Sequence, residues 1–323
     1  MWKRSLPIPA LSLAFLLIRF ASVAYADEAG VERFDGGVHV TLDRKPFADY
    51  LTKSWSKPIV WPIIGPHGQQ MTRNFPMLKV EGEKQDHPHH RSLWFTHGDI
   101  NGIDFWAETP KAGKVIHRDF LKCAGVGPAA VISTVNDWIG PDGKKQCEDV
   151  RTLTFRGNDE QRTIDFDITL KATDGPVVFG DTKEGTMGLR VPTSMDANQK
   201  DVAKRGEIVN SKGQRNDDAW GKQAAWVDYH GNVGGKTVGV AILNHPTSLR
   251  YPTYWHVRTY GLFAANPFGL HDFRGTKDAN EGAYTLLAGE TLSLRYRFLF
   301  HLGDEKAGHV AEAFEAYSQE SRP

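Results

Sequence analysis

Apolar and polar residues alternate with a period of two along much of the chain. The alternation is clear in these segments: residues 37–43, 129–140, 147–157, 162–175, 236–243, 254–263 and 290–303. Each segment predicts a β-strand with one buried face, and turn signals at residues 141–144, 157–159 and 174–176 separate neighbouring strands. Helical periodicity is convincing only over residues 305–319, with Asp304 as the expected N-cap. The pattern predicts an all-β fold, a large antiparallel sandwich of two sheets with a C-terminal helix.

The first 26 residues have the composition of an export signal. Lys3 and Arg4 precede an apolar run at residues 10–18, and residues 24–26 read Ala-Tyr-Ala, a small-x-small cleavage site. The run is too short to span a bilayer, and no later segment approaches about 18 consecutive apolar residues. We therefore expect a signal peptide over residues 1–26, cleaved after Ala26, and a periplasmic or secreted protein without an integral membrane segment.

The charge balance restricts the classes of partner. The chain has 39 Lys and Arg against 39 Asp and Glu, and loss of residues 1–26 leaves 36 against 39. A nearly neutral chain with interspersed charges indicates neither a nucleic-acid partner nor an acidic membrane surface. No linker, repeat or low-complexity tract divides residues 27–323, so we expect a single domain. Cys123 and Cys147 are the only cysteines; a disulfide between them and two free thiols are both compatible with export.

Titratable side chains are concentrated in DHPHHRSLWF, residues 86–95. Pro88 disfavours a helical conformation for His87, so the segment is extended or a turn. If a strand begins at His89, alternation turns His90 to the opposite face. The three histidines then do not converge on one metal unaided, although two of them with a distant carboxylate would suit a divalent ion. We predict a ligand site formed by these side chains: His87, His89, His90, Arg91 and His97.

A second cluster occupies residues 251–269. A strand over residues 254–263 would place four side chains on one face: Tyr254, His256, Arg258 and Tyr260. Such a face makes a poor core and a good binding surface, because it combines a planar donor, a titratable imidazole and flat aromatic rings. Asn266 follows where a loop would meet the site.

A third cluster is DTKEGTMGLRV, residues 181–191. An extended conformation would align Glu184, Thr186, Gly188 and Arg190 on one face, with glycines that allow close approach of a ligand or another backbone. Glu184 would supply a carboxylate and Arg190 a donor for an anion or a hydroxyl group.

Two weaker stretches, residues 224–231 and 243–246, complete the candidate site. In the first, Asp228 and His230 share a face and Tyr229 lies on the other; in the second, His245 precedes a proline. We include Tyr229 and His245 among the substrate-binding residues. The chain has no Gly-rich phosphate loop followed by a helix, no G-x-S-x-G elbow, no H-E-x-x-H motif and no calcium loop. Nucleotide cofactors and a serine-triad hydrolase are therefore disfavoured.

Four long stretches resemble, in this order, the PmoA-like family of exported bacterial proteins: WPIIGPHGQQMTRNFPM, DHPHHRSLWFTHGDINGIDFW, GDTKEGTMGLRVP and WHVRTYGLFAANPFG. The resemblance runs from about Trp61 to the terminal helix. It implies a galactose-mutarotase-like supersandwich, a fold used by sugar epimerases, many polysaccharide lyases and some glycoside hydrolases. The methane-monooxygenase subunit called PmoA is an integral membrane protein, and this chain has no membrane span, so we interpret the family's label "methane oxygenase PmoA" as a misnomer.

Together, the residues and the resemblance predict an exported carbohydrate-active enzyme that acts on a glycoside or oligosaccharide by acid–base chemistry. Hydrolysis, elimination and epimerisation all remain open. We expect Glu184 and His256 as base and acid, with His90 as the alternate catalytic residue. Arginines would bind or neutralise an anionic centre; these are Arg91, Arg190 and Arg258.

Two other functions stay open from the sequence. The first is a carbohydrate-binding protein without catalysis, which would use the same aromatic rings and arginines. The second is a metal-dependent oxidoreductase, as the family label suggests, with His87, His89 or His90 and a distant carboxylate as ligands of a divalent metal. No cofactor is indicated with certainty.

Overall fold

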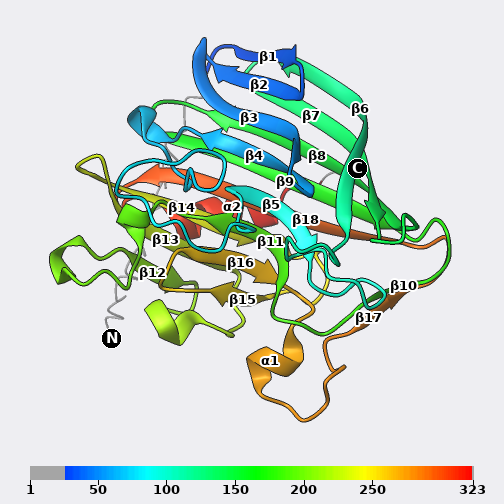
Figure 1. Ribbon diagram of the computed structural model, residues 1–323. Helices are drawn as coiled ribbons and strands as arrows, with labels where there is room; N and C mark the ends of the chain where they lie inside the picture. The colour runs from blue at the N-terminus through cyan, green and yellow to red at the C-terminus, as the bar shows by residue number, and fades with distance from the viewer. Residues whose placement is uncertain (1–25, 322–323) are drawn as a thin grey trace, which may run out of the picture.

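The computed structural model describes residues 26–321 and consists of two large antiparallel β-sheets and a short two-stranded pair (Figure 1). The first sheet has the spatial order β1 (Ala29–Phe34), β2 (Gly37–Leu42), β3 (Lys45–Ser54), β4 (Lys57–Ile63), β5 (Leu93–His97), β11 (Gly185–Arg190), β16 (Leu262–Asn266) and β15 (Tyr254–Val257). The second has the order β12 (Glu207–Asn210), β13 (Trp226–Val233), β14 (Lys236–Asn244), β18 (Thr291–Leu302), β9 (Gln161–Lys171), β8 (Lys145–Gly157), β7 (Ala129–Ile139) and β6 (Lys114–Val126). The short pair is β10 (Val177–Phe179) with β17 (Tyr284–Leu286). The predicted all-β, two-sheet architecture is confirmed.

The core lies between the two large sheets. Phe95 of β5 contacts Trp138 of β7 and Phe166 of β9, with ring centroids 6.2 and 6.5 Å apart. Phe47 of β3 packs edge-on against Phe155 of β8 at 5.6 Å. Burial of these inward-facing side chains is the main stabilising contribution, and it forces the alternate residues of each strand to the outer faces.

Helical structure is sparse and lies outside the sandwich. In the part of the chain that the structure describes, it comprises α1 (Leu270–Arg274), α2 (Val310–Ser318) and four 3-10 turns, η1 (Pro66–Gly68), η2 (Thr193–Met195), η3 (Val202–Lys204) and η4 (Asn216–Ala219). Helix α2 packs through Val310 and Tyr317 against the outer face of the second sheet. The helix predicted for residues 305–319 is present only from Val310 onward, because Asp304 Oδ1 accepts from the backbone N–H groups of residues 306 and 307 and closes a separate turn. The expectation that Asp304 caps the helix is therefore wrong.

The single strand predicted over residues 254–263 is a hairpin. Strand β15 ends at Val257, β16 begins at Leu262, and the N–H of Arg258 donates to the carbonyl of Leu262 at 2.8 Å. Gly261 has φ +97°, the left-handed conformation that a tight turn requires and that glycine adopts without strain. The alternation of aromatic and polar residues continues through this turn, so periodicity alone does not reveal it.

Three expectations concern features at the margin of the fold. The predicted signal peptide, residues 1–26, lies outside the described residues except for Ala26. Cys123 and Cys147 are free thiols. Within residues 26–321, no helix is long and apolar enough to cross a membrane.

Candidate functional site

Neighbouring strands of the first sheet place four residues in one row on the face turned away from the core. Trp94 of β5 pairs with Gly188 of β11, Gly188 pairs with Ala264 of β16, and Ala264 pairs with His256 of β15. The middle two residues are small, and the Trp94 indole lies over Gly188, where a Cβ atom would come within 2.7 Å of Trp94 Cζ2. The sequence thus builds a shallow floor between an indole and an imidazole. We call this surface the outer face.

A column of parallel rings stands on the Trp94 indole. The imidazole of His90 stacks on Trp94 with centroids 5.6 Å apart, and His87 stacks on His90 at 5.0 Å and 3°. The phenol of Tyr260 stacks on the other side of His87 at 5.0 Å and 5°. We refer to Trp94, His90, His87 and Tyr260 as the imidazole column. His90 is buried, whereas the His87 side chain is 40% exposed and reaches solvent.

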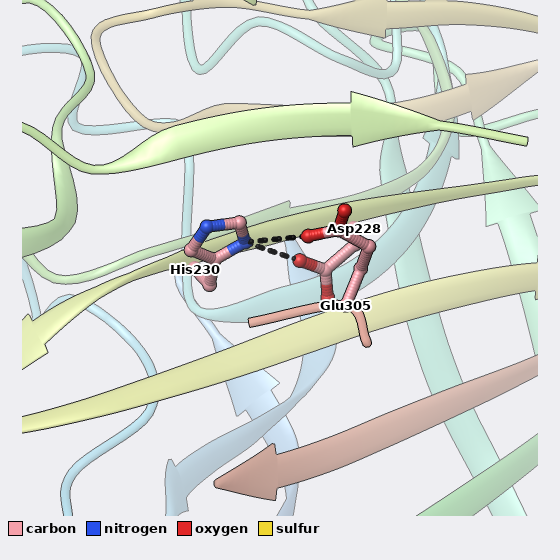
Figure 2. A group of neighbouring side chains, drawn as sticks. All are labelled: Asp228, His230 and Glu305. Carbon is pink, nitrogen blue, oxygen red and sulfur yellow. Dashed lines mark hydrogen bonds and ion pairs between the residues drawn. The ribbon is translucent and has the colours of Figure 1, made fainter. Parts of the chain in front are cut away.

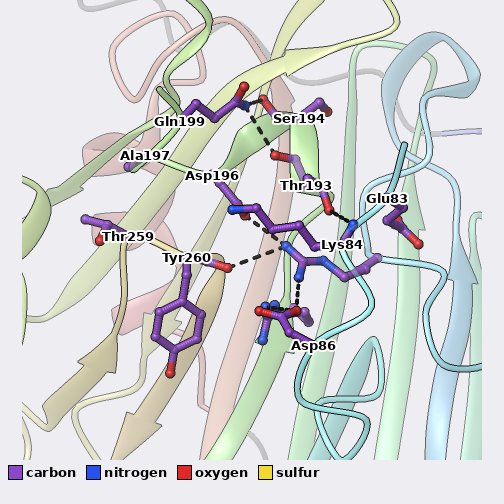
Figure 3. Close-up of polar contacts among 12 residues, drawn as sticks. Glu83, Lys84, Asp86, Thr193, Ser194, Asp196, Ala197, Gln199, Thr259 and Tyr260 are labelled. Carbon is purple, nitrogen blue, oxygen red and sulfur yellow. Dashed lines mark hydrogen bonds and ion pairs between the residues drawn. The ribbon is translucent and has the colours of Figure 1, made fainter. Parts of the chain in front are cut away.

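A network of arginines and aspartates fixes the column. Arg190 donates from Nη1 to His90 Nδ1 at 2.7 Å and from Nη2 to Asp86 Oδ1 at 2.8 Å. Arg73 donates to the same Asp86 oxygen at 2.7 Å and to Asp196 at 2.9 Å. Figure 3 shows Asp86, Asp196 and the backbone carbonyl of Tyr260 among the polar contacts of this network. Partial burial acts to raise the pKa of Asp86, but the two guanidinium groups outweigh burial and lower it.

The imidazoles of His89 and His90 are held neutral. Burial, reinforced by the nearby charges of Lys57 and His87, lowers the pKa of His89 to about 4. Burial also lowers the pKa of His90 well below its ordinary value. Because an arginine is always a donor, His90 Nδ1 must be the unprotonated nitrogen, and its proton is on Nε2.

A buried cluster of charges lies beside the column. Glu108 accepts two hydrogen bonds from Arg91, from Nε at 2.7 Å and from Nη2 at 2.8 Å. Lys57 Nζ lies 3.2 Å from Glu108 and 5.8 Å from the centre of the Trp94 ring. Burial lowers the pKa of Lys57 to about 8. The guanidinium of Arg91, predicted to bind substrate, is therefore engaged with Glu108. Lys57, which also pairs with Glu108, is the member of this cluster that lies near the Trp94 ring of the imidazole column.

His256 contacts the end of the loop before β11, the loop that carries Glu184. His256 donates from Nδ1 to the carbonyl of Lys183 at 2.8 Å, and Asn266 donates to the same carbonyl at 3.1 Å and to that of Thr182 at 2.9 Å. Asn266 thus holds the loop that carries Glu184. Burial raises the pKa of Glu184 and lowers that of His256 to about 4. Glu184 is therefore more readily protonated than an ordinary glutamate, and His256 is neutral near pH 7.

The hairpin turn brings Arg258 to the same place. Its guanidinium carbon lies 5.7 Å from the Tyr260 ring and 5.7 Å from the Trp220 ring. The Tyr260 phenol, whose pKa is raised by burial, also experiences the charges of Arg258, Arg190, Glu184 and Asp86. The three clusters predicted from separate segments of the sequence therefore meet around Tyr260.

Three predicted binding residues lie elsewhere. His97 points to the core side of β5, where its Nε2 lies 2.8 Å from the carbonyl of Gly180. The Tyr229 hydroxyl is buried in the core and donates to the carbonyl of Thr259 at 3.0 Å. His245 belongs to the second sheet, where it contacts Arg295. His97 and Tyr229 are separated from the outer face because they are buried in the core, and His245 because it lies at the second sheet.

Strand alternation accounts for part of this distribution. Strand β5 starts at Leu93 and not at His89. Period-two alternation therefore places Trp94 and His97 on opposite faces, as expected, but it does not apply to Arg91. Thr186, expected beside Gly188 and Arg190, donates to the carbonyl of Ala265 and is buried.

Several residues of the site were not predicted. Lys57, Arg73 and Trp106 are single chemical groups within otherwise apolar or loop segments, so no local clustering marks them. Tyr260 belongs to the face that residues 254–263 predict as a binding surface, and Asp86 belongs to the stretch DHPHHRSLWF, but no specific role for either side chain follows from the sequence.

A separate cluster of titratable side chains lies on the second sheet, on the side turned away from the core (Figure 2). His230 Nδ1 lies 2.7 Å from Asp228 and 4.0 Å from Glu305, and the ligand atoms of these three residues lie within 4.8 Å of one another. This set could hold a metal ion. Asp228 also bonds His301 Nε2 at 2.7 Å, so both of its oxygens already have partners. In contrast, His87 and His90 face each other with parallel rings, an arrangement that does not direct their nitrogens to a common ion.

The chain resembles solved structures in its arrangement of strands. A galactose mutarotase-like protein from Clostridium acetobutylicum is 9% identical with a TM-score of 0.41, over 85% of this chain and 98% of that chain. A galactose mutarotase related enzyme from Lactobacillus acidophilus is 11% identical with a TM-score of 0.29, over 84% and 97%. A GH36 α-galactosidase from Geobacillus stearothermophilus, in complex with raffinose, is 11% identical with a TM-score of 0.30, over 85% of this chain and 40% of that chain.

Sequence comparison identifies the family. No match was found among curated protein sequences. A family model described as "Family of unknown function (DUF6807)" matches residues 37–315, nearly the whole of the two-sheet domain, and the chain therefore belongs to this family.

Proposed function

We propose that the protein is a carbohydrate-active enzyme that binds a glycoside or oligosaccharide on the outer face and acts on it by acid–base chemistry. The observation that carries the proposal is the convergence of the imidazole column, the carboxyl group of Glu184 and the guanidinium of Arg258 around Tyr260. A site of flat rings rimmed by hydrogen-bonding groups suits a sugar, whose C–H faces stack on rings while its hydroxyl groups need donors and acceptors.

The acid–base roles follow from the environments of two side chains. Glu184 has a raised pKa, so a larger share of it is protonated near neutral pH than of an ordinary glutamate. It would donate a proton to the departing oxygen. His256 is neutral with its proton on Nδ1, so Nε2 would accept a proton. Hydrolysis, elimination and epimerisation each use such a pair.

A neighbouring groove favours an extended substrate. Its volume is about 930 Å³, and its lining includes Trp55, Lys53, Lys114 and Glu108. Trp55 is 67% exposed, a large apolar ring left in solvent where a sugar could stack. Glu108 lines this groove and also pairs with Lys57 beside the imidazole column. An oligosaccharide would span both, which favours bond cleavage over epimerisation of a free sugar.

The test is a panel of neutral and acidic oligosaccharides incubated with the purified protein. New reducing ends without ultraviolet absorbance would indicate hydrolysis, absorbance from unsaturated products would indicate elimination, and faster anomer exchange alone would indicate epimerisation. Glu184→Gln should abolish turnover, whereas Glu160→Gln, an exposed carboxylate outside the site, should leave it unchanged. Equal activity of both variants would refute the role of Glu184.

A carbohydrate-binding protein without catalysis is the second candidate, because the aromatic column and the arginines would serve binding equally well. The wild-type protein would then show no turnover, and replacing Glu184 or His256 with alanine would only weaken sugar binding. Export of the protein is part of the proposal, since residues 1–26 have the composition of a signal peptide. N-terminal sequencing of the protein secreted by its host would test it.

A further inference from the structure

We propose that Lys57, His90, Trp94 and Trp106 form an oxyanion-binding subsite that takes the carboxylate of an acidic sugar, a uronic acid residue, in the substrate. This inference rests on the proposed carbohydrate function and names the class of sugar that the same face would select.

Three buried ring N–H groups at this place have no acceptor. They are His90 Nε2, Trp94 Nε1 and Trp106 Nε1, and none has a hydrogen-bond partner among the described residues. The rings are mutual neighbours, with centroids 5.0 Å apart for Trp94 and Trp106, 5.6 Å for His90 and Trp94, and 5.7 Å for His90 and Trp106. Folded proteins rarely leave a buried donor unpaired, and three in contact indicate a place where an acceptor is expected.

The proton on His90 Nε2 is fixed by its other nitrogen. Nδ1 accepts from Arg190, so Nε2 can only donate. An indole N–H is likewise a donor and never an acceptor. The three groups therefore cannot satisfy one another, and a shared partner has to be rich in acceptor oxygens.

The local charge balance favours an anion. Lys57, Arg91 and Glu108 have side chains that are 0%, 11% and 6% exposed, so two buried cations share one buried carboxylate. Both Glu108 oxygens accept from Arg91, which leaves Lys57 with the weaker contact at 3.2 Å. Lys57 Nζ is also 3.4 Å from the backbone carbonyl of Trp106 and close to the Trp94 ring, so its charge acts directly at the unpaired donors. A buried positive charge in excess is stabilised by a carboxylate and not by a neutral hydroxyl group.

Access is controlled by the outermost imidazole. His87 covers His90 in the column, lies in the connection between β4 and β5, and is 40% exposed. A ligand would displace His87 and reach the edge of the His90 ring, because an imidazole N–H lies in the plane of its ring. The groove beside Glu108 also carries Lys53 and Lys114 in its lining, which suits further acidic residues of the same saccharide.

The experiment compares uronates with neutral sugars of the same configuration. Binding of galacturonate, digalacturonate, galactose and galactobiose would be measured by tryptophan fluorescence and calorimetry. We expect the acidic sugars to bind at least tenfold more tightly than their neutral counterparts. Trp106→Phe, which keeps a ring and removes the N–H, should weaken the acidic sugars about tenfold and leave neutral sugars within twofold. Lys57→Met should do the same, and circular dichroism would confirm that each variant is folded.

The outcomes separate the two proposals. Neutral sugars bound as tightly as uronates, or uronate affinity unchanged in folded Trp106→Phe, would overturn the carboxylate subsite and leave the carbohydrate function standing. If neither class of sugar binds, the carbohydrate function falls and this inference falls with it. Leu78→Ala, an exposed apolar side chain, is the control and should alter neither affinity.

Discussion

The guanidinium of Arg190 donates to Nδ1 of His90 at 2.7 Å, and both side chains are almost fully buried. This contact joins β11 to the loop before β5, about a hundred residues away in the chain. It fixes the tautomer of His90 and keeps that ring parallel to His87 and Trp94. The imidazole column depends on it.

Replacing Arg190 with Gln should destabilise the protein by about 2–4 kcal/mol, because Asp86 and His90 both lose a buried charged donor. Chemical unfolding at neutral pH would measure the change. Arg118→Gln is the control, since Arg118 also pairs with two carboxylates but is 45% exposed, and it should cost less than about 1 kcal/mol. Equal costs for the two variants would contradict the structural role of Arg190.

Adding a methyl group at Gly188 should disturb the column from below. A Cβ atom there would come within 2.7 Å of Trp94 Cζ2, so the indole must move, at a cost of about 1–3 kcal/mol. Gly188→Ala in a Trp94→Phe background should cost clearly less, because the smaller ring leaves room. A double-mutant cycle from unfolding curves measures this difference, and strict additivity would exclude the contact.

Acid should destabilise the protein through His97 and His256. Burial lowers the folded-state pKa of each to about 4, below the ordinary value of 6.5. As the pH falls from 6.5 towards 4, the unfolded chain takes up protons that the folded chain does not, so stability falls by about 1.4 kcal/mol per pH unit for each group. Above 6.5 this contribution is fully present and constant. His97→Gln should reduce the slope of unfolding free energy against pH, whereas exposed His309→Gln should not.

The cluster of Asp228, His230 and Glu305 on the second sheet should make the stability of the protein depend on pH in the opposite direction. Burial opposes protonation of His230, but the hydrogen bond and charge of Asp228 outweigh burial and raise its pKa. The resulting stability is fully present below pH 6.5 and is lost as the pH rises through the folded-state value. Asp228→Asn should therefore cost about 2–4 kcal/mol, with a larger loss at pH 6 than at pH 8. Asp201→Asn, an exposed carboxylate, is the control; a loss that does not depend on pH would contradict this assignment.

Trp55 should contribute to binding and not to stability. Its ring is 67% exposed in the groove beside Glu108, so Trp55→Ala removes little buried area. Oligosaccharides that extend along the groove should bind about tenfold more weakly to the variant, and monosaccharides should be unaffected. Calorimetric titration measures both, with the exposed Leu287→Ala as the control. A parallel loss for monosaccharides would place Trp55 outside an extended subsite.

Local pattern determined the strands of this protein. Apolar and polar residues alternate at residues 129–139 and 162–171 because one face of each strand is buried and the other is more exposed. Strands β7 and β9 can therefore be predicted from the sequence. A local concentration of titratable residues, and not alternation, identified the stretch that contains His87, and the mixture of polar and aromatic residues marked the stretch that contains His256. A period-two pattern can continue through a turn, so it does not show where a strand is interrupted. For this reason the sequence does not predict the hairpin turn at Arg258.

Only the tertiary structure decided which of these groups meet. The spatial order β5, β11, β16, β15 joins segments from residues 93 to 266, and strand pairing across such separations leaves no local trace in the sequence. The same packing placed His97 in the core and brought Lys57 and Trp106, which no local cluster of titratable residues marks, to the column. The pKa directions of Glu184 and His256 also belong to the fold, because burial arises from residues distant in the chain.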